Sequence, residues 1–183
     1  MVQWKRIGEA TSQKVGWRTI VRKRYQFPDG SEHDFDTIGP EGYEAAAIIA
    51  LTPDNRLVIS EQYRPGPDKS MLELPGGFLD ENEPPEKAAR RELMEETGYE
   101  AGRVDYLGFI YPEAYLEMKS HYFIGYDCKE VAEPQYESTE YIEVKTITID
   151  EFLEAARSGG TTNVAAAFLA YDILMKLKEK RVV

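Results

Sequence analysis

The feature that most restricts the fold of this chain is a helix whose two ends are marked in the sequence. Pro84 and Pro85 stand at its start, and Gly98 stands just past its end. Proline suits the first turn of a helix because its missing N–H group is not needed there, and glycine suits the residue after the last turn. These positions predict a helix over residues 85–97, and the rest of the fold must cover its apolar strip.

The same helix carries a crowded acidic face. Glu92 and Glu96 are four residues apart and share one face, with Glu95 beside them. Like charges at this spacing cost about 0.2–0.5 kcal/mol per pair, and the C-terminal half of a helix disfavours anions, so helix stability does not explain them. Two interpretations follow: a solvated face partly neutralised by Arg90 and Arg91, or a site for Mg²⁺ or Mn²⁺, which prefer oxygen ligands.

Strand patterns surround this helix. Residues 17–38 alternate apolar and polar side chains on both sides of a Phe-Pro-Asp-Gly turn, which predicts an N-terminal antiparallel hairpin or sheet. Further strands are predicted at residues 44–51, 57–63, 104–110, 121–126 and 141–147. Two helices should close the chain, one ending at Gly159 and one beginning after residues 161–163. Strands interleaved with a few helices predict an α/β fold with a mixed sheet covered on two faces.

We divide the chain into an N-terminal β region, residues 1–43, and a main domain, residues 44–183. Its composition restricts the partners of both. The net charge of −11 repels nucleic acids and anionic membrane surfaces. Cys128 is the single cysteine, which excludes an intramolecular disulfide and favours a reducing compartment. No segment approaches the roughly 20 apolar residues of a membrane span. We therefore expect a cytoplasmic protein that acts on a small molecule.

The stretch GFLDENEPPEKAARRELMEETGY resembles a known family. Gly77, Glu83 and the run from Arg91 to Tyr99 match every fixed position of the Nudix hydrolase box. This resemblance favours the metal interpretation over the solvated face. It implies a Nudix α/β/α sandwich with a mixed sheet, in which the box forms a loop, a helix and a loop. It also implies hydrolysis of a nucleoside diphosphate linked to another moiety.

The resemblance assigns a role to each residue of the box. Glu92 and Glu96 would be the main ligands of Mg²⁺, with Mn²⁺ as a substitute, and Glu95 would be an adjacent ligand or its support. The carbonyl of Gly76 would lie close to the metal, and Arg91 would orient the glutamates. Three further residues would shape the loop: Glu83, Gly77 and Gly98.

The residues before the box resemble the ADP-ribose and ADP-sugar pyrophosphatase branch, in which SEQYRPG precedes LELPGG. This likeness implies that Arg64 binds the diphosphate and that Glu73 contacts the terminal ribose. Trp17 and Phe35 would stack around the adenine, with packing in a core as the alternative for each ring. In that branch the N-terminal sheet is exchanged between two chains, so we expect a homodimer with an exchanged N-terminal β region.

The sequence leaves both the substrate and the class of protein open. Pro112 follows Tyr99 by 13 residues, whereas the branch usually carries this proline two or three residues later. A different nucleotide sugar such as GDP-mannose is therefore an alternative to ADP-ribose. His121 occupies a strand position that is commonly polar in the branch, and we expect it to be packed. A non-catalytic domain that senses ADP-ribose is the alternative from another class, although the intact box favours an enzyme.

The general base is expected in AEPQYESTEYIEV, because the family places a catalytic glutamate immediately before a strand like YIEV. Glu140 is the first candidate and Glu137 the second. Glu143 is a candidate for a further metal contact.

Overall fold

The computed structural model describes residues 3–136 and 141–179. Backbone contacts divide the chain into two compact units. The first, called here the N-terminal unit, comprises residues up to Glu44 together with 111–119. The second, called here the main unit, comprises residues 45–110 and those from Ser120 onward. No helix of the described residues is long and apolar enough to cross a lipid bilayer.

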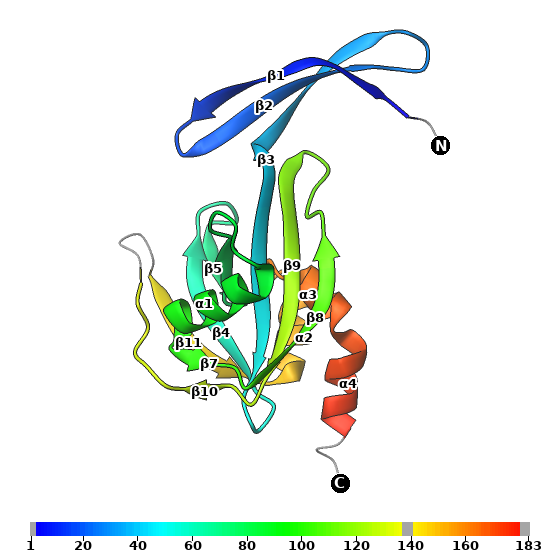
Figure 1. The fold of residues 1–183 in the computed structure, drawn as a ribbon. Helices are drawn as coiled ribbons and strands as arrows, with labels where there is room; N and C mark the ends of the chain where they lie inside the picture. The colour runs from blue at the N-terminus through cyan, green and yellow to red at the C-terminus, as the bar shows by residue number, and fades with distance from the viewer. Residues whose placement is uncertain (1–2, 137–140, 180–183) are drawn as a thin grey trace. The chain divides into compact units, whose positions relative to one another are not determined.

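The N-terminal unit contains an antiparallel sheet formed by β1 (Lys5–Val15), β2 (Arg18–Gln26) and the first half of β3 (Glu32–Leu51) (Figure 1). The predicted hairpin is confirmed: β2 and β3 pair, and the N–H of Gly30 donates to the carbonyl of Phe27 across the turn, 2.9 Å. Strand β1 was not predicted, because its sequence KRIGEATSQKV is polar and has no regular alternation.

An aromatic cluster packs on this sheet. Trp4 stacks on Phe27 with the ring centroids 4.3 Å apart and on Phe35 with the centroids 5.1 Å apart. Tyr25 meets Phe35 edge to face. Such contacts between rings are favourable beyond the burial of their area. Phe35 is therefore held within the sheet of its own chain.

The sheet of the main unit contains the second half of β3 and several further strands. They are β4 (Leu57–Arg64), β5 (Lys69–Glu73), β6 (Gly76–Phe78), β8 (Arg103–Ile110), β9 (Leu116–Tyr126) and β11 (Ile142–Ile147). Strand β4 lies between β3 and β11, and β9 pairs with both β3 and β8. Two short strands, β7 (Tyr99–Glu100) and β10 (Lys129–Glu130), form a separate pair.

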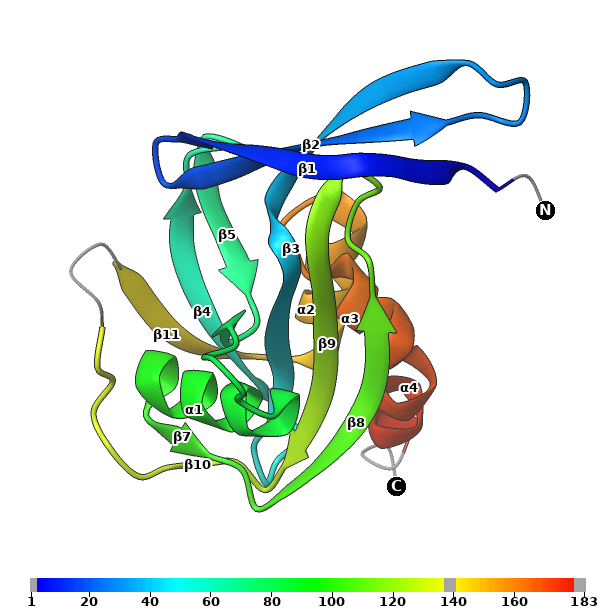
Figure 2. The same cartoon turned by 45° about the horizontal axis from the view of Figure 1, so that its top comes forward.

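Helices cover both faces of the sheet in the main unit (Figures 1 and 2). Strand β3 shows why: Ile48 and Ala50 pack in the cluster that includes α1, whereas Ile49 and Leu51 pack in the cluster that includes the C-terminal helices. Successive side chains of a strand point to opposite faces, so a continuous apolar run requires cover on both sides. The predicted α/β class is confirmed.

Helix α1 (Pro85–Thr97) has the predicted bounds and is followed by Gly98 in the left-handed conformation, with φ of 73°. Helix α2 (Ile149–Ser158) begins with a capping box formed by Thr148 and Glu151 and ends before Gly159, as expected.

The last predicted helix is two helices, α3 (Val164–Leu169) and α4 (Tyr171–Glu179). They are separated at Ala170, which is fully buried. The interruption leaves Ala166 on α3 and Leu174 on α4 in the same hydrophobic cluster.

Two predicted strands are longer than expected. The predicted segments up to residue 38 and over 44–51 are one strand, β3, which continues through Gly39 and Gly42 although both have positive φ. Strand β9 begins at Leu116 instead of residue 121. Its first residues include Glu117, which pairs with Lys23, so polar contacts replace the hydrophobic pattern that prediction relied on.

Candidate active site

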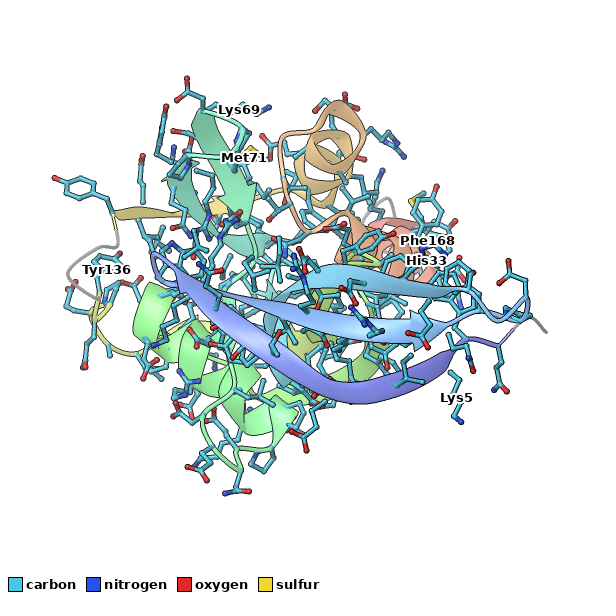
Figure 3. All side chains as sticks on the ribbon, turned by 90° about the horizontal axis from the view of Figure 1, so that it is seen from above. Lys5, His33, Lys69, Met71, Tyr136 and Phe168 are labelled. Carbon is cyan, nitrogen blue, oxygen red and sulfur yellow. The ribbon has the colours of Figure 1, made fainter. Side chains whose placement is uncertain are left out.

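A cleft of about 720 Å³ lies along α1 in the main unit. Its walls come from β4, from β6 and the loop after it, from one face of α1, and from the segment before residue 137. Figure 3 shows Tyr136, from that segment, beside α1. The lining residues are Gln62, Arg64, Gly76, Gly77, Phe78, Asp80, Arg91, Glu92, Glu95, Glu96, Gln135 and Tyr136. The structure thus brings the three helix glutamates together with Arg64 and Arg91.

The side chain of Arg91 donates hydrogen bonds to four residues of the predicted box. Its Nη1 donates to Glu92, 2.8 Å, and to Glu95, 2.9 Å. Its Nε and Nη2 donate to the two oxygens of Glu83 at 3.1 and 2.9 Å, and Nη2 also donates to the carbonyl of Phe78, 3.1 Å. A planar guanidinium can hold several acceptors at once, which a lysine cannot do with the same geometry. The loop and the helix are therefore fastened together at one side chain.

These hydrogen bonds change the proton affinity of both partners. The bonds to Glu83, and then those to Glu95 and Glu92, raise the pKa of Arg91 further above its ordinary value. The bond from Arg91 in turn lowers the pKa of Glu83, whose side chain is only 4% exposed. Both groups are charged at neutral pH, so the cross-link persists under ordinary conditions.

Glu96 is held from the opposite direction. It is 6% exposed, and the hydroxyl of Ser60 on β4 donates to its Oε2, 2.8 Å. Ser60 itself is fully buried. The carboxylate of Glu96 is therefore fixed against the sheet, whereas Glu92 and Glu95 are oriented by a residue of their own helix.

Two glycines allow the loop before α1 to reach the helix. A Cβ at Gly77 would lie 2.4 Å from Oε1 of Glu92, and one at Gly76 would lie 2.5 Å from the carbonyl oxygen of Ala46. Both distances are far below a normal contact, so any other residue would displace the loop or the carboxylate. Gly77 is therefore required by close packing against Glu92, and Gly76 by close packing against β3.

The chemistry of the donors fits a hard divalent cation, because the helix offers only carboxylate oxygens. Within residues 3–136 and 141–179, however, no group of three or more His, Cys, Asp or Glu side chains is arranged so that it could hold a metal ion. Glu92 and Glu95 turn toward Arg91, and Glu96 is bonded by Ser60. A cation here would need ligands beyond the three carboxylates as they lie, and Mg²⁺ commonly takes these from water and substrate phosphate.

Arg64 lines the cleft at the end of β4, and Glu73 lies behind it. The Nε of Arg64 donates to Oε2 of Glu73, 2.7 Å, and Gln62 donates to the same oxygen, 3.2 Å. The hydroxyl of Thr162 donates to Oε1, 2.7 Å. Both oxygens of this buried carboxylate are engaged by protein side chains, so in this structure Glu73 supports Arg64. A contact of Glu73 with a ribose remains a prediction.

The structure of a single chain does not bring Trp17 and Phe35 together. Trp17 is 80% exposed in the turn between β1 and β2, where the guanidinium of Arg18 lies 4.9 Å from its ring centroid. Phe35 pairs with Lys23 across β2 and β3. Six residues of extended strand separate Trp17 from Lys23, which is about 20 Å. One base cannot be stacked between these two rings of the same chain.

The remaining sequence candidates lie apart from the cleft or outside the described residues. Glu140 and Glu137 belong to the latter group. Glu143 is on β11, 71% exposed, and pairs with Lys145, 3.2 Å. His121 is buried on β9, where its Nδ1 and the hydroxyl of Tyr106 are 2.9 Å apart, in agreement with the expectation that it is packed.

Several cleft residues were missed by sequence reasoning. Gln62 and Arg64 occupy alternate positions of β4 and point to the same face of the sheet. Extending the pattern backward from Arg64 by two residues would have found Gln62. Gln135 and Tyr136 carried no such signal, because they reach the cleft through a backbone contact: the N–H of Gln135 donates to the carbonyl of Glu95, 2.7 Å.

The model of the NUDIX domain matches residues 42–167. Because this match covers more than half of the 183 residues, the chain belongs to the NUDIX domain family and is a Nudix hydrolase.

Individual relatives are similar over most of the chain. It is 34% identical over 160 residues to the methanol dehydrogenase activator of Bacillus methanolicus. The aligned residues cover 84% of this chain and 85% of the relative. It is 25% identical over 153 residues to the ADP-ribose pyrophosphatase of Bacillus subtilis, which covers 82% of each. A crystal structure of an ADP compounds hydrolase matches with a TM-score of 0.80 and 21% identity, over 96% of this chain and 97% of that one. The last match confirms the fold.

The bond between Arg91 and Glu83 predicts how stability depends on pH. Because the pKa of Glu83 in the folded state is lowered, its ionised form stabilises the fold at pH above about 4.3, and this contribution disappears as the pH falls through the lowered value. Glu83→Gln should therefore lower the free energy of unfolding by about 1–2 kcal/mol near neutral pH. The difference from the wild type should shrink in acid. Urea unfolding at a series of pH values measures both.

The control is Glu86→Gln on the same helix. Glu86 pairs with Arg90 at 3.0 Å, but its side chain is 52% exposed, and such surface pairs contribute about 0.5 kcal/mol or less. A difference between wild type and Glu83→Gln that stays constant from neutral to acid pH would contradict the assignment.

Proposed function

We propose that this chain hydrolyses the diphosphate linkage of a nucleoside diphosphate sugar in a Mg²⁺-dependent reaction, and that its main substrate is ADP-ribose, which gives AMP and ribose 5-phosphate. One observation carries the proposal. Glu92, Glu95 and Glu96 line the same cleft as Arg64, so that carboxylates suited to a cation face a guanidinium suited to phosphate. A diphosphate held together with a divalent cation matches this combination of charges.

Each side chain has a definite task in this proposal. Arg64, supported by Glu73, binds diphosphate oxygens. Arg91 keeps Glu92 and Glu95 in position to bind the cation, and the carbonyl of Gly76 lies on the same cleft. When bound, the cation neutralises charge at the diphosphate and makes water more acidic, which prepares it for attack on phosphorus.

A general base must take the proton of the attacking water. We propose Glu140 for this role, since it follows the segment that the backbone bond between Gln135 and Glu95 holds to the end of α1. A carboxylate is a common general base for an attacking water.

The similarity to the ADP-ribose pyrophosphatase of Bacillus subtilis and to the ADP compounds hydrolase structure supports a substrate that contains an adenosine diphosphate group. The early position of Pro112 keeps another nucleotide sugar, such as GDP-mannose, as the alternative. We propose that Trp17 and Phe35 select the base.

A substrate panel tests the proposed reaction. ADP-ribose, ADP-glucose, GDP-mannose and NADH are incubated with the chain, with Mg²⁺ and with chelator, and the products are separated by chromatography. We expect fastest turnover of ADP-ribose and none with chelator. Glu92→Gln should lower kcat by more than about 100-fold, because losing an outer partner of a metal ligand already costs about 10–100-fold.

Glu100→Gln is the matched control, an exposed glutamate just beyond the same helix, and it should keep wild-type turnover. If none of the four compounds is turned over in the presence of metal, the proposal that a nucleoside diphosphate sugar is the substrate fails.

A second experiment tests the base. Glu140→Gln should lower kcat by about 10²–10⁴-fold, the usual contribution of general acid-base catalysis, with little change in KM. Glu137→Gln and Glu143→Gln, measured in parallel, show whether the loss belongs to this one glutamate. A kcat of Glu140→Gln within about threefold of wild type would remove it from the mechanism.

A third experiment tests base stacking between chains. We propose a homodimer in which the N-terminal β region, residues 1–43, is exchanged, because Trp17 and Phe35 of one chain are too far apart to enclose a base. Light scattering should give the mass of two chains. Trp17→Ala should raise KM for ADP-ribose about tenfold or more with kcat nearly unchanged, since stacking contributes about 1–3 kcal/mol per base.

Val15→Ala is the control for this experiment, because Val15 is exposed at the same turn. The mass of one chain would refute the exchanged dimer, and an unchanged KM would refute stacking on Trp17.

A further inference from the structure

The strand beneath the metal helix contributes a buried hydroxyl to it. Ser60 has no exposed surface, and it lies on β4 two residues after Val58, which packs in the same cluster as α1. Residues two apart on a strand face the same side of the sheet, so Ser60 points with Val58 toward α1 and away from α2. Its hydroxyl donates to Oε2 of Glu96, 2.8 Å.

A serine at this position is unusual for the local environment. Its neighbours on β4, Val58 and Ile59, are fully buried and apolar. A buried hydroxyl costs free energy unless it is hydrogen-bonded, and a buried carboxylate costs more. The bond gives the hydroxyl of Ser60 an acceptor and Oε2 of Glu96 a donor, and it restricts rotation of the carboxylate.

We propose that Ser60 is a positioning residue of the metal site, which fixes the carboxylate of Glu96 by engaging one of its two oxygens. The proposal rests on the proposed function, because it takes Glu96 to be a metal ligand. In this proposal the three glutamates are oriented by residues from two layers of the fold, the helix and the sheet. Arg91 orients Glu92 and Glu95 from the helix, and Ser60 orients Glu96 from the sheet.

This division has a physical reason. Glu96 faces the sheet and is almost completely buried, whereas the side chain of Glu95 is 46% exposed. A ligand between the helix and the sheet can be held by a short, rigid side chain of the sheet, and a serine loses little conformational freedom when it does so. Outer partners of this kind orient metal ligands and strongly affect metal affinity.

Binding of Mn²⁺ to the full chain without nucleotide tests the proposal independently of turnover. Free Mn²⁺ is followed by electron paramagnetic resonance during titration of wild type, Ser60→Cys and Ser60→Ala. A thiol is a weak donor and alanine has none. The Kd for Mn²⁺ should therefore rise in the order Ser, Cys, Ala, by about 10–100-fold for alanine.

Two controls separate positioning from a general loss of structure. Ser120→Ala removes another buried serine, on β9, and should bind Mn²⁺ like wild type. Circular dichroism and thermal melting check that each variant is folded, and Ser60→Cys, which keeps a weak donor at the same position, decides the matter if Ser60→Ala does not fold. The double variant of Ser60→Ala with Glu96→Gln should bind no more weakly than Glu96→Gln alone, because Ser60 acts through Glu96.

The outcomes separate this proposal from the proposed function. If Glu96→Gln weakens Mn²⁺ binding and Ser60→Ala and Ser60→Cys stay within about twofold of wild type, Ser60 is not a positioning residue and the metal site stands. Additive effects in the double variant also overturn the role of Ser60. If wild type binds no Mn²⁺, or binds it as Glu96→Gln does, the metal role of Glu96 fails, and the role of Ser60 fails with it.

Discussion

The guanidinium of Arg91 is the interaction on which the arrangement of the candidate site depends. It contacts Glu83 and Phe78 of the loop on one side and Glu92 and Glu95 of the helix on the other. Acidic side chains this close to one another would otherwise repel. A single cation that serves several carboxylates lets the helix keep them on one face, and it lowers the pKa of Glu83 so that this carboxylate stays ionised. The charge cluster is therefore compatible with a stable fold.

The layered packing of the main unit determines where this cluster can lie. Helix α1 buries Ala88, Ala89 and Leu93 against the sheet, and small residues on that strip let the helix approach closely. Gly76 and Gly77 bring the loop equally close on the other side. Glu92 and Glu96 therefore lie in a narrow space between loop, helix and strand. Both glutamates line the cleft that Arg64 also lines.

How far the sequence predicts this protein depends on how local the cause of each feature is. Helix α1 was predicted to the residue because Pro84, Pro85 and Gly98 act within a few bonds of its ends. Strand β1 was missed because its pairing with β2, and not its own pattern, makes it a strand. The box glutamates were singled out by their spacing on the helix together with the resemblance to the Nudix box. Ser60 was not, because its importance lies in a contact with a residue 36 positions away, and no local pattern carries that information.

The same distinction explains why the chemistry of this chain is better defined than its choice of substrate. The residues suited to bind a cation and a diphosphate lie on α1, β4 and β6. Strands β4 and β6 belong to one sheet, and α1 packs on that sheet. The aromatic rings proposed to select the base lie in the other compact unit, and Trp17 is exposed at a turn where its own chain gives it little support. An exposed ring contributes binding energy only when a second surface encloses the base with it. Under the proposed exchange of the N-terminal β region, selection of the base would therefore depend on the assembly of chains, whereas binding of the cation and the diphosphate would depend on the fold of each one.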